Sequence, residues 1–389
     1  MTDINGKNQV IALLRRQPLS RVDLANQTGL VKSSLTKITQ QLITQQLVEE
    51  VPEHESTAKC TKGRPKTLLR LVAGKNVSIC CHLSIEGLYV ILIDHTNKIL
   101  GHEKISWDLP KEKRVFEAKE LVAIIKQHGK KLCRQHHVPF NELRIVTVAT
   151  QGKIAQRSGV IHSSQLFKER HFNFANLIEQ ELGCPAKIFN IAFCNTTQLQ
   201  INYSRIRNFV DLLLAYGVGI GISIDDKIML GPDGTAPEIT HMNYKRDGNP
   251  CYCGAYGCCE TYVTYRAIIQ QIEDSTGQTI PGADYKEQLK YISTQVTEGN
   301  RPYIDVVNRA GEALGFIIGQ FTTVWDIHDV ILSGPVGILY DHLKPVILRQ
   351  LNESNDFKFA ESKLNLWYEK DHNLPFYGLI ELTNSSYQV

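Results

Sequence analysis

Three cysteines and a histidine form the strongest chemical signal in this sequence. His241 is followed by Cys251, Cys253 and Cys258, with the spacing H-x9-C-x-C-x4-C. Thiolate and imidazole groups are the ligands that Zn²⁺ prefers, and four protein ligands leave no open coordination position for a substrate. Two glycines between Cys253 and Cys258 let the backbone wrap around an ion. The sequence therefore predicts one structural zinc ion per chain, held by these four residues.

Two carboxylates flank this cluster. Glu238 precedes His241 by three residues, and Glu260 follows the last cysteine by two. With these flanks, residues 231–260 resemble the signature of the ROK family, which contains sugar kinases and sugar-responsive repressors. In the kinases of that family, the residues that match Glu238, His241 and Glu260 bind sugar hydroxyls, a task that suits carboxylates because their oxygens accept hydrogen bonds. The resemblance implies an effector site in a cleft between two α/β halves, lined by Asn190, Glu238, His241 and Glu260.

The chain departs from the kinase features that this resemblance implies. The family's aspartate base falls on Ile191, or on Asn190 in the other register, and neither side chain can act as a base. The first glycine-rich phosphate loop is replaced by residues 82–87, which place Glu86 where a phosphate would approach. The second loop, residues 217–221, keeps its glycines but has valine at the usual threonine, and a tight turn between strands explains those glycines equally well. We therefore expect that the protein is not an enzyme.

Length and composition are those of an ordinary globular protein. The chain has 389 residues, of which 42% are hydrophobic and 21% charged, enough for two or three domains. Its ten cysteines lie in apolar segments or at ligand spacing, and no secretory signal is recognisable, so we expect a cytoplasmic location. The longest apolar stretch, near residues 88–93, is far shorter than the roughly 20 residues that span a bilayer. An integral membrane protein is therefore not expected.

Positive charge is concentrated at the N-terminus. The net charge of the whole chain is only +3, but residues 1–70 hold eleven Lys and Arg against six Asp and Glu. A basic module on a nearly neutral body favours a polyanionic partner for that module. On charge alone, a solvated basic face is an equally good interpretation, so the pattern of the segment has to decide.

The pattern of the N-terminal segment is that of a winged helix-turn-helix. Apolar residues recur at helical spacing over 10–14, Pro18 ends that helix, and Ser20 is a candidate N-cap with Asp23 three residues later. Gly29 gives the turn before a third helix, over 32–46. The buried face of that third helix is expected to consist of Leu35, Ile38, Leu42 and Ile43. The strands of the wing are expected at 48–51 and 68–72.

The outer face of the third helix carries donors suited to phosphates and to base edges in a major groove. The expected DNA-binding residues of this helix are Lys32, Ser33, Ser34, Lys37 and Gln41. Arg64, in the Gly-Arg-Pro-Lys segment 63–66, is expected to enter a narrow A·T-rich minor groove, with a solvated turn as the alternative. Segments 20–25 and 63–66 resemble the winged-helix modules of the repressor branch of the ROK family, although an ordinary polar helix surface would share much of this pattern.

Beyond residue 74 the pattern changes to alternating strands and helices. The first half is expected to contain strands at 77–83, 88–93, from 99, 145–150 and 186–189, and helices at 117–136 and 174–182. The second half is expected to contain strands at 212–216, 220–224, 227–230 and 330–332, and helices from 264 and 303. Each half opens with a three-stranded meander, which fits the duplicated actin-like, ribonuclease H-like α/β fold that the resemblance implies.

Three domains are predicted from this pattern. A winged helix-turn-helix with its linker covers 1–72, a first α/β subdomain covers 73–195, and a second covers 196–389 with the zinc site and an oligomerisation surface. The predicted function is a DNA-binding transcriptional repressor of sugar-uptake or sugar-utilisation genes. It would bind a double-stranded operator as a homodimer or tetramer, under the control of a sugar or sugar phosphate.

Two other functions remain open at this stage. The first is a regulator controlled by a sugar-transporter subunit, as in some members of the family, and the second is an ATP-dependent sugar kinase. Retention of Glu238, His241 and Glu260 favours a sugar pocket, whereas loss of the aspartate weakens it. The basic N-terminal module and the altered kinase features favour a regulator over a kinase.

Overall fold

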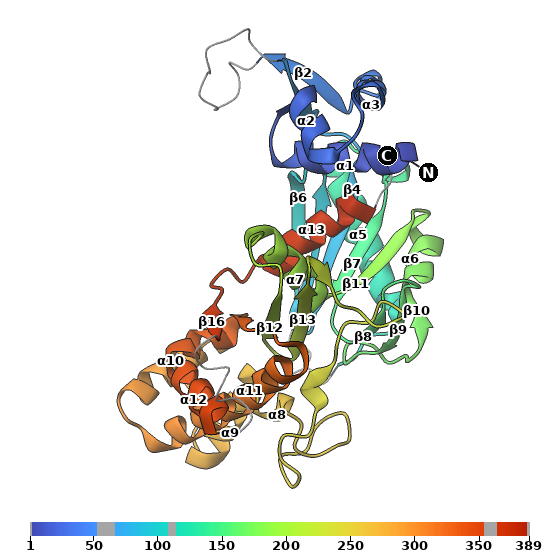
Figure 1. The fold of residues 1–389 in the computed structure, drawn as a ribbon. Helices are drawn as coiled ribbons and strands as arrows, with labels where there is room; N and C mark the ends of the chain where they lie inside the picture. Colours follow the sequence, from blue (N-terminus) through green and yellow to red (C-terminus); the bar gives the residue numbers. More distant parts are fainter. Residues whose placement is uncertain (1, 53–66, 108–113, 354–363, 387–389) are drawn as a thin grey trace. The chain divides into compact units, whose positions relative to one another are not determined.

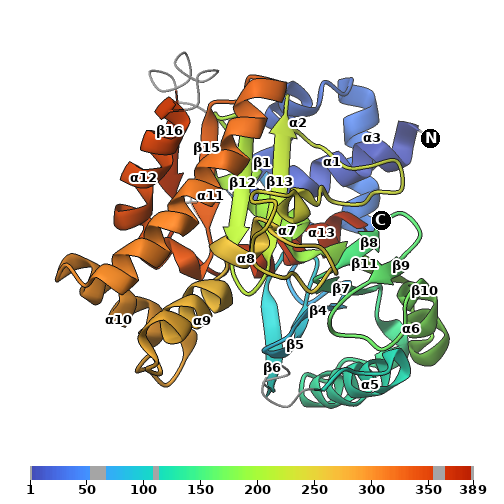
Figure 2. The ribbon, with the colours of Figure 1, turned by 90° about the horizontal axis from the view of Figure 1, so that it is seen from below.

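The computed structural model describes residues 2–52, 67–107, 114–353 and 364–386. The chain forms two compact units (Figures 1 and 2). The first contains residues 1–189 together with 379–389, and the second contains residues 190–378. Among the described residues, no helix has both the length and the hydrophobicity that crossing a membrane requires.

The first unit begins with three short helices and a small antiparallel sheet. The helices are α1 (Thr2–Arg16), α2 (Arg21–Thr28) and α3 (Lys32–Thr44). The sheet has the order β1-β3-β2, with β1 (Leu19–Ser20), β2 (Val48–Pro52) and β3 (Thr67–Leu71). Ser20 caps α2, because its Oγ accepts a hydrogen bond from Asp23 N at 3.2 Å, and Gly29 ends the helix in the left-handed conformation. This is the element order that a winged helix-turn-helix requires (Figure 1).

The core of this N-terminal module is the predicted apolar face of α3 packed on its neighbours. Leu24 of α2 and Leu35, Ile38 and Leu42 of α3 are at most 1% exposed, and all belong to one hydrophobic cluster. The helix ends at Thr44, two residues before the predicted end. It ends there because Gln46 adopts a positive φ of 56°, and Leu47 N then donates back to Leu42 O.

The rest of the first unit contains a five-stranded sheet with the order β11-β7-β4-β5-β6. Its strands are β4 (Ser78–Ser84), β5 (Gly87–Ile93), β6 (Ile99–Ser106), β7 (Val146–Thr150) and β11 (Ala186–Asn190). Strands β4, β5 and β6 form the predicted antiparallel meander, and β7 runs parallel to β4. The helices of this part are α5 (Ala118–Gln135), the 3-10 helix η2 (Phe140–Glu142) and α6 (Phe174–Leu182).

Two features of this unit were not predicted. Strands β8 (Lys153–Ala155), β9 (Val160–Ser163) and β10 (Phe172–Asn173) form a small antiparallel sheet. The C-terminal helix α13 (Leu374–Ser386) also returns to the first unit, where Thr383 and Thr147 of β7 share a hydrogen bond at 2.6 Å. The predicted division at 195/196 assigned this segment to the second subdomain, because a contact across 236 residues leaves no local pattern.

The second unit repeats the sheet of the first. Its strands are β12 (Phe209–Leu214), β13 (Val218–Ile224), β14 (Lys227–Ile228), β15 (Asp329–Ser333) and β16 (Asn365–Tyr368), in the order β14-β13-β12-β15-β16. Again an antiparallel meander is followed by a strand parallel to its first member. Each sheet therefore has the same strand order relative to its own meander, as a duplicated fold requires. The first strand was predicted at 212–216, but it runs from Phe209 to Leu214. The prediction missed its start because Asp211, a charged type of residue, interrupts the apolar pattern of a strand that is buried over most of its length.

Helices surround this second sheet. They are α7 (Ile191–Asn202), α8 (Glu260–Val263), α9 (Tyr265–Thr276), α10 (Tyr285–Thr297), α11 (Arg301–Trp325) and α12 (Tyr340–Glu353), with 3-10 helices η3 (Ile239–His241) and η4 (Pro335–Leu339). In Figure 2, helices α9 to α12 gather on one side of the sheet. The core of the unit joins residues of β12, β15, α9, α11 and α12.

Candidate functional site

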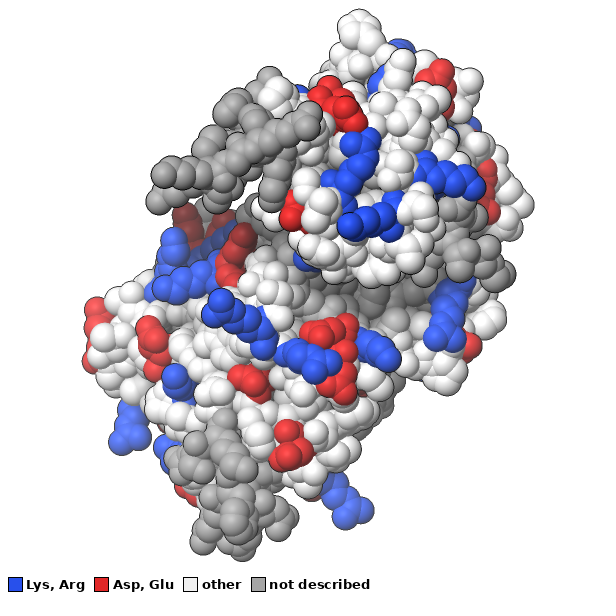
Figure 3. All heavy atoms as spheres, turned by 45° about the horizontal axis from the view of Figure 1, so that its top comes forward, with Lys and Arg blue, Asp and Glu red and all other residues white. Residues whose placement is uncertain are grey.

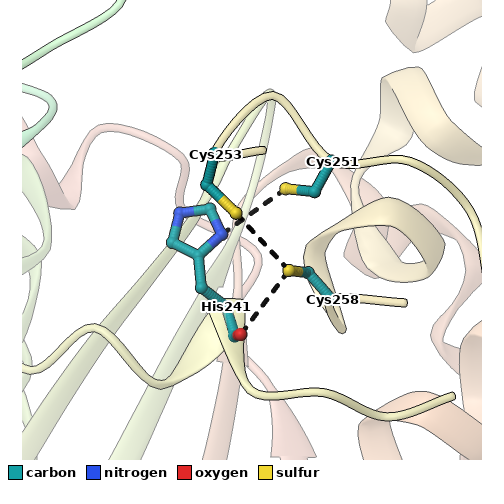
Figure 4. Close-up of side chains that lie close together, drawn as sticks. All are labelled: His241, Cys251, Cys253 and Cys258. Carbon is teal, nitrogen blue, oxygen red and sulfur yellow. Dashed lines mark hydrogen bonds between the residues drawn. The ribbon is translucent and has the colours of Figure 1, made fainter. Parts of the chain in front are cut away.

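The four predicted zinc ligands lie together at one end of the loop between η3 and α8 (Figure 4). His241 Nδ1 is 3.5 Å from Cys251 Sγ, and Cys253 Sγ is 3.7 Å from Cys258 Sγ. All four ligand atoms lie within 4.8 Å of one another. Short backbone hydrogen bonds shape the loop, among them Cys251 N to Ala255 O at 2.8 Å.

These separations fit a single tetrahedral zinc ion. With zinc–sulfur bonds of about 2.3 Å and zinc–nitrogen bonds of about 2.0–2.1 Å, two sulfurs are about 3.8 Å apart and a sulfur and a nitrogen are about 3.5 Å apart. The Cys253–Cys258 and Cys251–His241 distances of 3.7 and 3.5 Å agree with both values. A donor set of three sulfurs and one imidazole also matches the chemistry of structural zinc sites. The four residues can therefore hold a zinc ion once the more distant ligand atoms, which lie within 4.8 Å of one another, move closer to it.

Glycine is required within the loop that carries the cysteines. Gly257 has a φ of 70°, and a Cβ added there would meet Lys245 O at 1.7 Å. That close approach lets Tyr244 N donate to Gly257 O at 2.8 Å, directly before Cys258. Gly254 has a φ of 91° in open space, so it serves the turn rather than a close contact.

The second ring nitrogen of His241 faces away from the sulfurs. His241 Nε2 lies 3.0 Å from the Tyr252 hydroxyl and 3.5 Å from Glu260 Oε2. With Nδ1 bound to a metal, Nε2–H is left to donate to one of these oxygens, an arrangement that orients ligand histidines in many metal sites. One side chain can thus serve the zinc cluster through one nitrogen and the predicted effector site through the other.

The carboxylates of the predicted effector site lie close to this histidine. Glu260 is 8% exposed, and burial raises the pKa of its carboxyl to about 7, with the neighbouring Glu238 raising it further and a hydrogen bond from Thr240 and the charge of Arg266 lowering it. Burial lowers the pKa of His241, and Glu238 opposes that shift. Glu238 itself is exposed. The structure therefore brings Glu238, His241 and Glu260 together around one polar surface.

Asn190 lies at the end of β11 and begins α7. Its Oδ1 accepts a hydrogen bond from Ala192 N at 2.8 Å, so the side chain is the N-cap of the helix. Ile191 follows as the first residue of α7 and is half-buried. Neither side chain can act as a base.

The glycines of residues 217–221 have a packing role. A Cβ at Gly219 would lie 2.5 Å from the Cβ of Ala192, and a Cβ at Gly221 would lie 1.6 Å from Thr196 Oγ1. These two glycines therefore let α7 lie directly on β13. A Cβ at Gly217, in the turn before β13, would lie 3.5 Å from Glu260 Oε1, so this turn lies beside Glu260 of the predicted effector site.

The predicted DNA-binding residues of α3 differ in exposure, and Gln41 Oε1 is buried without a hydrogen-bond partner among the described residues. Lys32, Ser33 and Lys37 are exposed, and Ser34 and Gln41 are half-buried. Arg64 lies outside the described residues. Figure 3 shows several Lys and Arg side chains close together on the surface in the upper part of the view.

The sequence analysis did not predict the C-terminal part of the α3 surface or the side chain that supports this helix. A shallow hollow beside α3 is lined by Lys7, Ser33, Thr36, Lys37, Gln40, Gln41, Thr44 and Gln45. The helical spacing of the polar residues after Lys37 could have indicated the C-terminal part. Arg21 of α2 supports α3 from inside, since its guanidinium donates to Thr39 Oγ1 at 3.1 Å and to Glu50 Oε1 at 2.7 Å.

Comparison with known proteins places these features in a family. The model of the ROK family matches residues 84–368. The DNA-binding transcriptional repressor Mlc of Escherichia coli K12 is 23% identical over 339 residues, which cover 85% of this chain and 80% of Mlc. A xylose repressor of Caldicellulosiruptor bescii is 22% identical over 348 residues, which cover 86% of this chain and 83% of that protein.

Solved structures show the same fold. A ROK family transcriptional regulator described as a homologue of the Escherichia coli MLC protein has a TM-score of 0.79 at 20% identity, and the match covers 98% of this chain and 96% of that one. A ROK family glucokinase of Streptomyces griseus, crystallised with glucose and AMPPNP, has a TM-score of 0.61 at 18% identity, and the match covers 79% of this chain and 99% of the kinase. Because the family model spans most of the sequence, from the end of β4 in the first sheet to the end of β16, the chain belongs to the ROK family.

Proposed function

We propose that this ROK protein is a DNA-binding transcriptional repressor of sugar-uptake or sugar-utilisation genes, controlled by a sugar or sugar phosphate. The observation that carries the proposal is α3, which buries one apolar face and presents hydroxyl, amide and ammonium groups on the other. These groups suit phosphates and base edges in a major groove. The helix belongs to a module that precedes the ROK segment in the sequence.

The contacts that hold α3 in place favour its role as a recognition helix. Arg21 ties it to α2 and β2, and its apolar face is part of the module's core, so its exposed side chains are held in a fixed register. One such helix reads only a few base pairs, so a dimer on a roughly palindromic operator is proposed, with half-sites about one DNA turn apart or a multiple of it. Two relatives, a DNA-binding transcriptional repressor and a xylose repressor, support the same function.

The DNA-binding proposal is tested by gel shifts with genomic fragments. Lys37→Ala should weaken binding to every sequence and reduce the salt dependence of binding by about one unit of slope, if Lys37 neutralises a phosphate. Ser33→Ala and Ser34→Ala should instead alter base preference. Lys227→Ala, which removes an exposed lysine of the other compact unit, is the matched control. Equal, salt-labile binding to all fragments would leave only a nonspecific basic module.

The ROK body is proposed to hold one structural zinc ion and a sugar effector. His241, Cys251, Cys253 and Cys258 would bind the ion, which would fix the loop that presents Glu238 and Glu260. The carboxylates and His241 Nε2 would then meet the hydroxyls of a sugar, with Asn190 contributing an amide. The effector would act by binding one conformation of the protein more tightly than another. It can shift the equilibrium between the two conformations only by the difference between its two affinities.

The effector proposal is tested by calorimetry with hexoses, N-acetylated hexosamines and their phosphates. Glu238→Gln should weaken any binding that is found, because an amide nitrogen cannot accept a hydroxyl hydrogen bond. Glu298→Gln, which changes an exposed glutamate that ends α10, is the control. No binding across the panel, together with binding to a sugar-transporter subunit, would favour a protein-sensing regulator.

A sugar kinase is the second candidate, because the ROK body shares its fold with a glucokinase. Ile191 and Asn190 offer no base, and the loss of a base costs about 10²–10⁴-fold in rate. Exposed Glu86 also stands where a phosphate loop would bind ATP. Coupled measurement of ADP release with a panel of sugars should find no turnover. A rate of about 1 per second or above would overturn the repressor-only proposal.

A further inference from the structure

A carboxyl group is buried in the middle of the second sheet. Asp211 lies in β12, a central strand between β13 and β15, and is 0% exposed. Burial raises the pKa of this carboxyl to about 7, and the interactions that oppose the rise all come from uncharged groups, Asn195, Ser333 and Thr196. On β13, the residue paired with Asp211 is Gly221. Burying a carboxyl without a cation is costly, so the position calls for a physical reason.

The partners of Asp211 come from two other elements. Asn195 Nδ2 of α7 donates to Asp211 Oδ2 at 2.7 Å, and Ser333 Oγ of β15 donates to Oδ1 at 2.8 Å. Asn195 Nδ2 also donates to Ser333 Oγ at 2.9 Å, and Thr196 Oγ1 lies 3.2 Å from Asp211 Oδ2. All four side chains are at most 1% exposed. They form a closed polar network that ties α7 to two strands of the sheet.

The network also satisfies its members in both charge states. When Asp211 is ionised, the Thr196 hydroxyl can donate to it, and when Asp211 is protonated, that hydroxyl can donate to Ala192 O, 2.9 Å away, and accept from the carboxyl. A buried polar network in which every member is satisfied is rigid, because any rotation leaves a group without a partner. An apolar contact would hold α7 as closely but would not fix its rotation or its position along the strand.

The position of α7 matters because of what lies at its start. Ala192 packs on Gly219 and Thr196 packs on Gly221, so α7 and β13 run in the same direction. The N-cap of α7, Asn190, therefore lies toward the end of β13 where the Gly217 turn approaches Glu260. Movement of α7 along β13 would change the distance between these two parts of the proposed effector site.

We propose that Asp211 is a positioning residue of the effector site, which holds α7 on the sheet through Asn195, Thr196 and Ser333 and so fixes Asn190 relative to Glu260. Asp211 itself does not touch the effector. The proposal rests on the proposed effector function, but its structural part, the docking of α7, can be tested without any ligand.

The test compares Asp211→Ala, which removes the network, with Asp211→Asn, which keeps the shape and can keep most hydrogen bonds after an amide flip. Thr322→Val is the matched control, because the Thr322 hydroxyl is buried in the same unit but donates only to Gly319 O of its own helix α11. Hydrogen exchange is measured for α7 and α11, and calorimetry is run with glucose, N-acetylglucosamine and their 6-phosphates. Each variant of the full-length protein is first checked for cooperative unfolding.

Asp211→Ala is expected to speed exchange in the first turns of α7 by about tenfold or more relative to α11, since it leaves buried groups unsatisfied. It should also weaken the binding of any of these sugars by a similar factor. Asp211→Asn should bring both the exchange rate of α7 and the sugar affinity most of the way back to their wild-type values. Thr322→Val should speed exchange in both helices alike and leave sugar affinity unchanged.

Equal acceleration of α7 and α11 in Asp211→Ala, or wild-type exchange and wild-type affinity in that variant, would overturn the positioning role. If the wild-type protein binds none of the four sugars, the effector function fails for them, while the exchange data still decide whether Asp211 holds α7.

Discussion

At the scale of single residues, His241 is shared by the proposed zinc site and the proposed effector site. Its Nδ1 faces the sulfurs and its Nε2 faces Glu260 and Tyr252, so the same ring can join the metal and the effector residues. Loss of the metal would therefore also free the His241 side chain, which the proposed effector site needs. Substitutions of the cysteines therefore test whether the proposed effector site depends on the metal.

Changing Cys251 and Cys253 together to serine is expected to abolish stoichiometric zinc, because only two of four ligands remain. The melting temperature should also fall, because metal bound only by the folded state stabilises it. Elemental analysis and thermal unfolding measure both quantities. Cys133→Ser, which changes a buried cysteine in α5, is the control for loss of a thiol alone. One zinc per chain in the double variant would refute the assignment.

Asp211 gives a pH dependence with a definite sign. The pKa of its carboxyl is about 7 in the folded protein, against 3.8 for an ordinary aspartate, so the folded state holds the proton more tightly. Its contribution to the free energy of unfolding is therefore fully present below about pH 4 and is lost as the pH rises to about 7, a change of at most about 4 kcal/mol.

Asp211→Asn removes this titration. The stability of the variant relative to wild type should rise as the pH increases from about 4 to about 7, and urea unfolding at several pH values measures the difference. Groups that titrate in both proteins, such as Glu260, cancel in that difference. Parallel stability curves for the two proteins would show that Asp211 keeps an ordinary pKa.

At the scale of elements, α3 depends on a neighbour for its place. Arg21 reaches from α2 to the hydroxyl of Thr39, which is 0% exposed on the inner side of α3, and to Glu50 of β2. The ion pair with Glu50 is partly exposed and contributes little by itself. The hydrogen bond to a buried hydroxyl is the stronger of the two links, because its loss leaves Thr39 with fewer partners.

Arg21→Ala is expected to destabilise the N-terminal module by about 1 kcal/mol and to weaken binding to all DNA fragments. The cause would be a less fixed α3 rather than a lost DNA contact. Hydrogen exchange of α3 and gel shifts measure the two effects together. Val22→Ala, at an exposed position of the same helix, should change neither. Weaker DNA binding with unchanged exchange in α3 would mean that Arg21 touches DNA directly.

At the scale of the whole molecule, a buried arginine of the N-terminal module links this module to the rest of the first unit. Arg15 of α1 donates from Nε to His95 O at 2.9 Å and from Nη2 to Asn384 O of α13 at 3.0 Å. Asn384 in turn donates to Asp94 O at 2.9 Å, and α1 and α13 therefore meet at the turn between β5 and β6. The helix α1 is thus held by a segment that lies 369 residues later in the sequence.

Arg15→Ala is expected to loosen this junction, since it leaves two carbonyl oxygens without a buried donor, at a cost of about 1–3 kcal/mol each. Limited proteolysis should then cut between the module and the body faster, and exchange in α1 and around residues 94–98 should increase. Arg16→Ala, at the exposed neighbouring position, is the control. Unchanged proteolysis of Arg15→Ala would show that the apolar contacts of α1 suffice.

The sequence by itself determined the features that depend on local pattern. The spacing of His241 and the three cysteines indicated a metal cluster, because ligands that lie within one short loop can reach one ion whatever the rest of the fold does. The apolar periodicity of α3 and the meanders of both sheets were equally readable, because helices and strands bury faces with fixed periods. The resemblance to the ROK family came from the same short segments.

Only the tertiary structure decided the features that join distant residues. The sequence gives no sign that Asn195, Asp211 and Ser333 meet, since 138 residues separate the first from the last. The start of β12 was also missed in the sequence because it contains Asp211. A carboxyl inside a buried strand costs free energy, so no strand is expected there until the hydrogen-bond partners of the carboxyl are known. The return of α13 to the first unit and the two directions of the His241 ring were hidden for the same reason: contacts between distant segments depend on packing in three dimensions, which leaves no period in the chain.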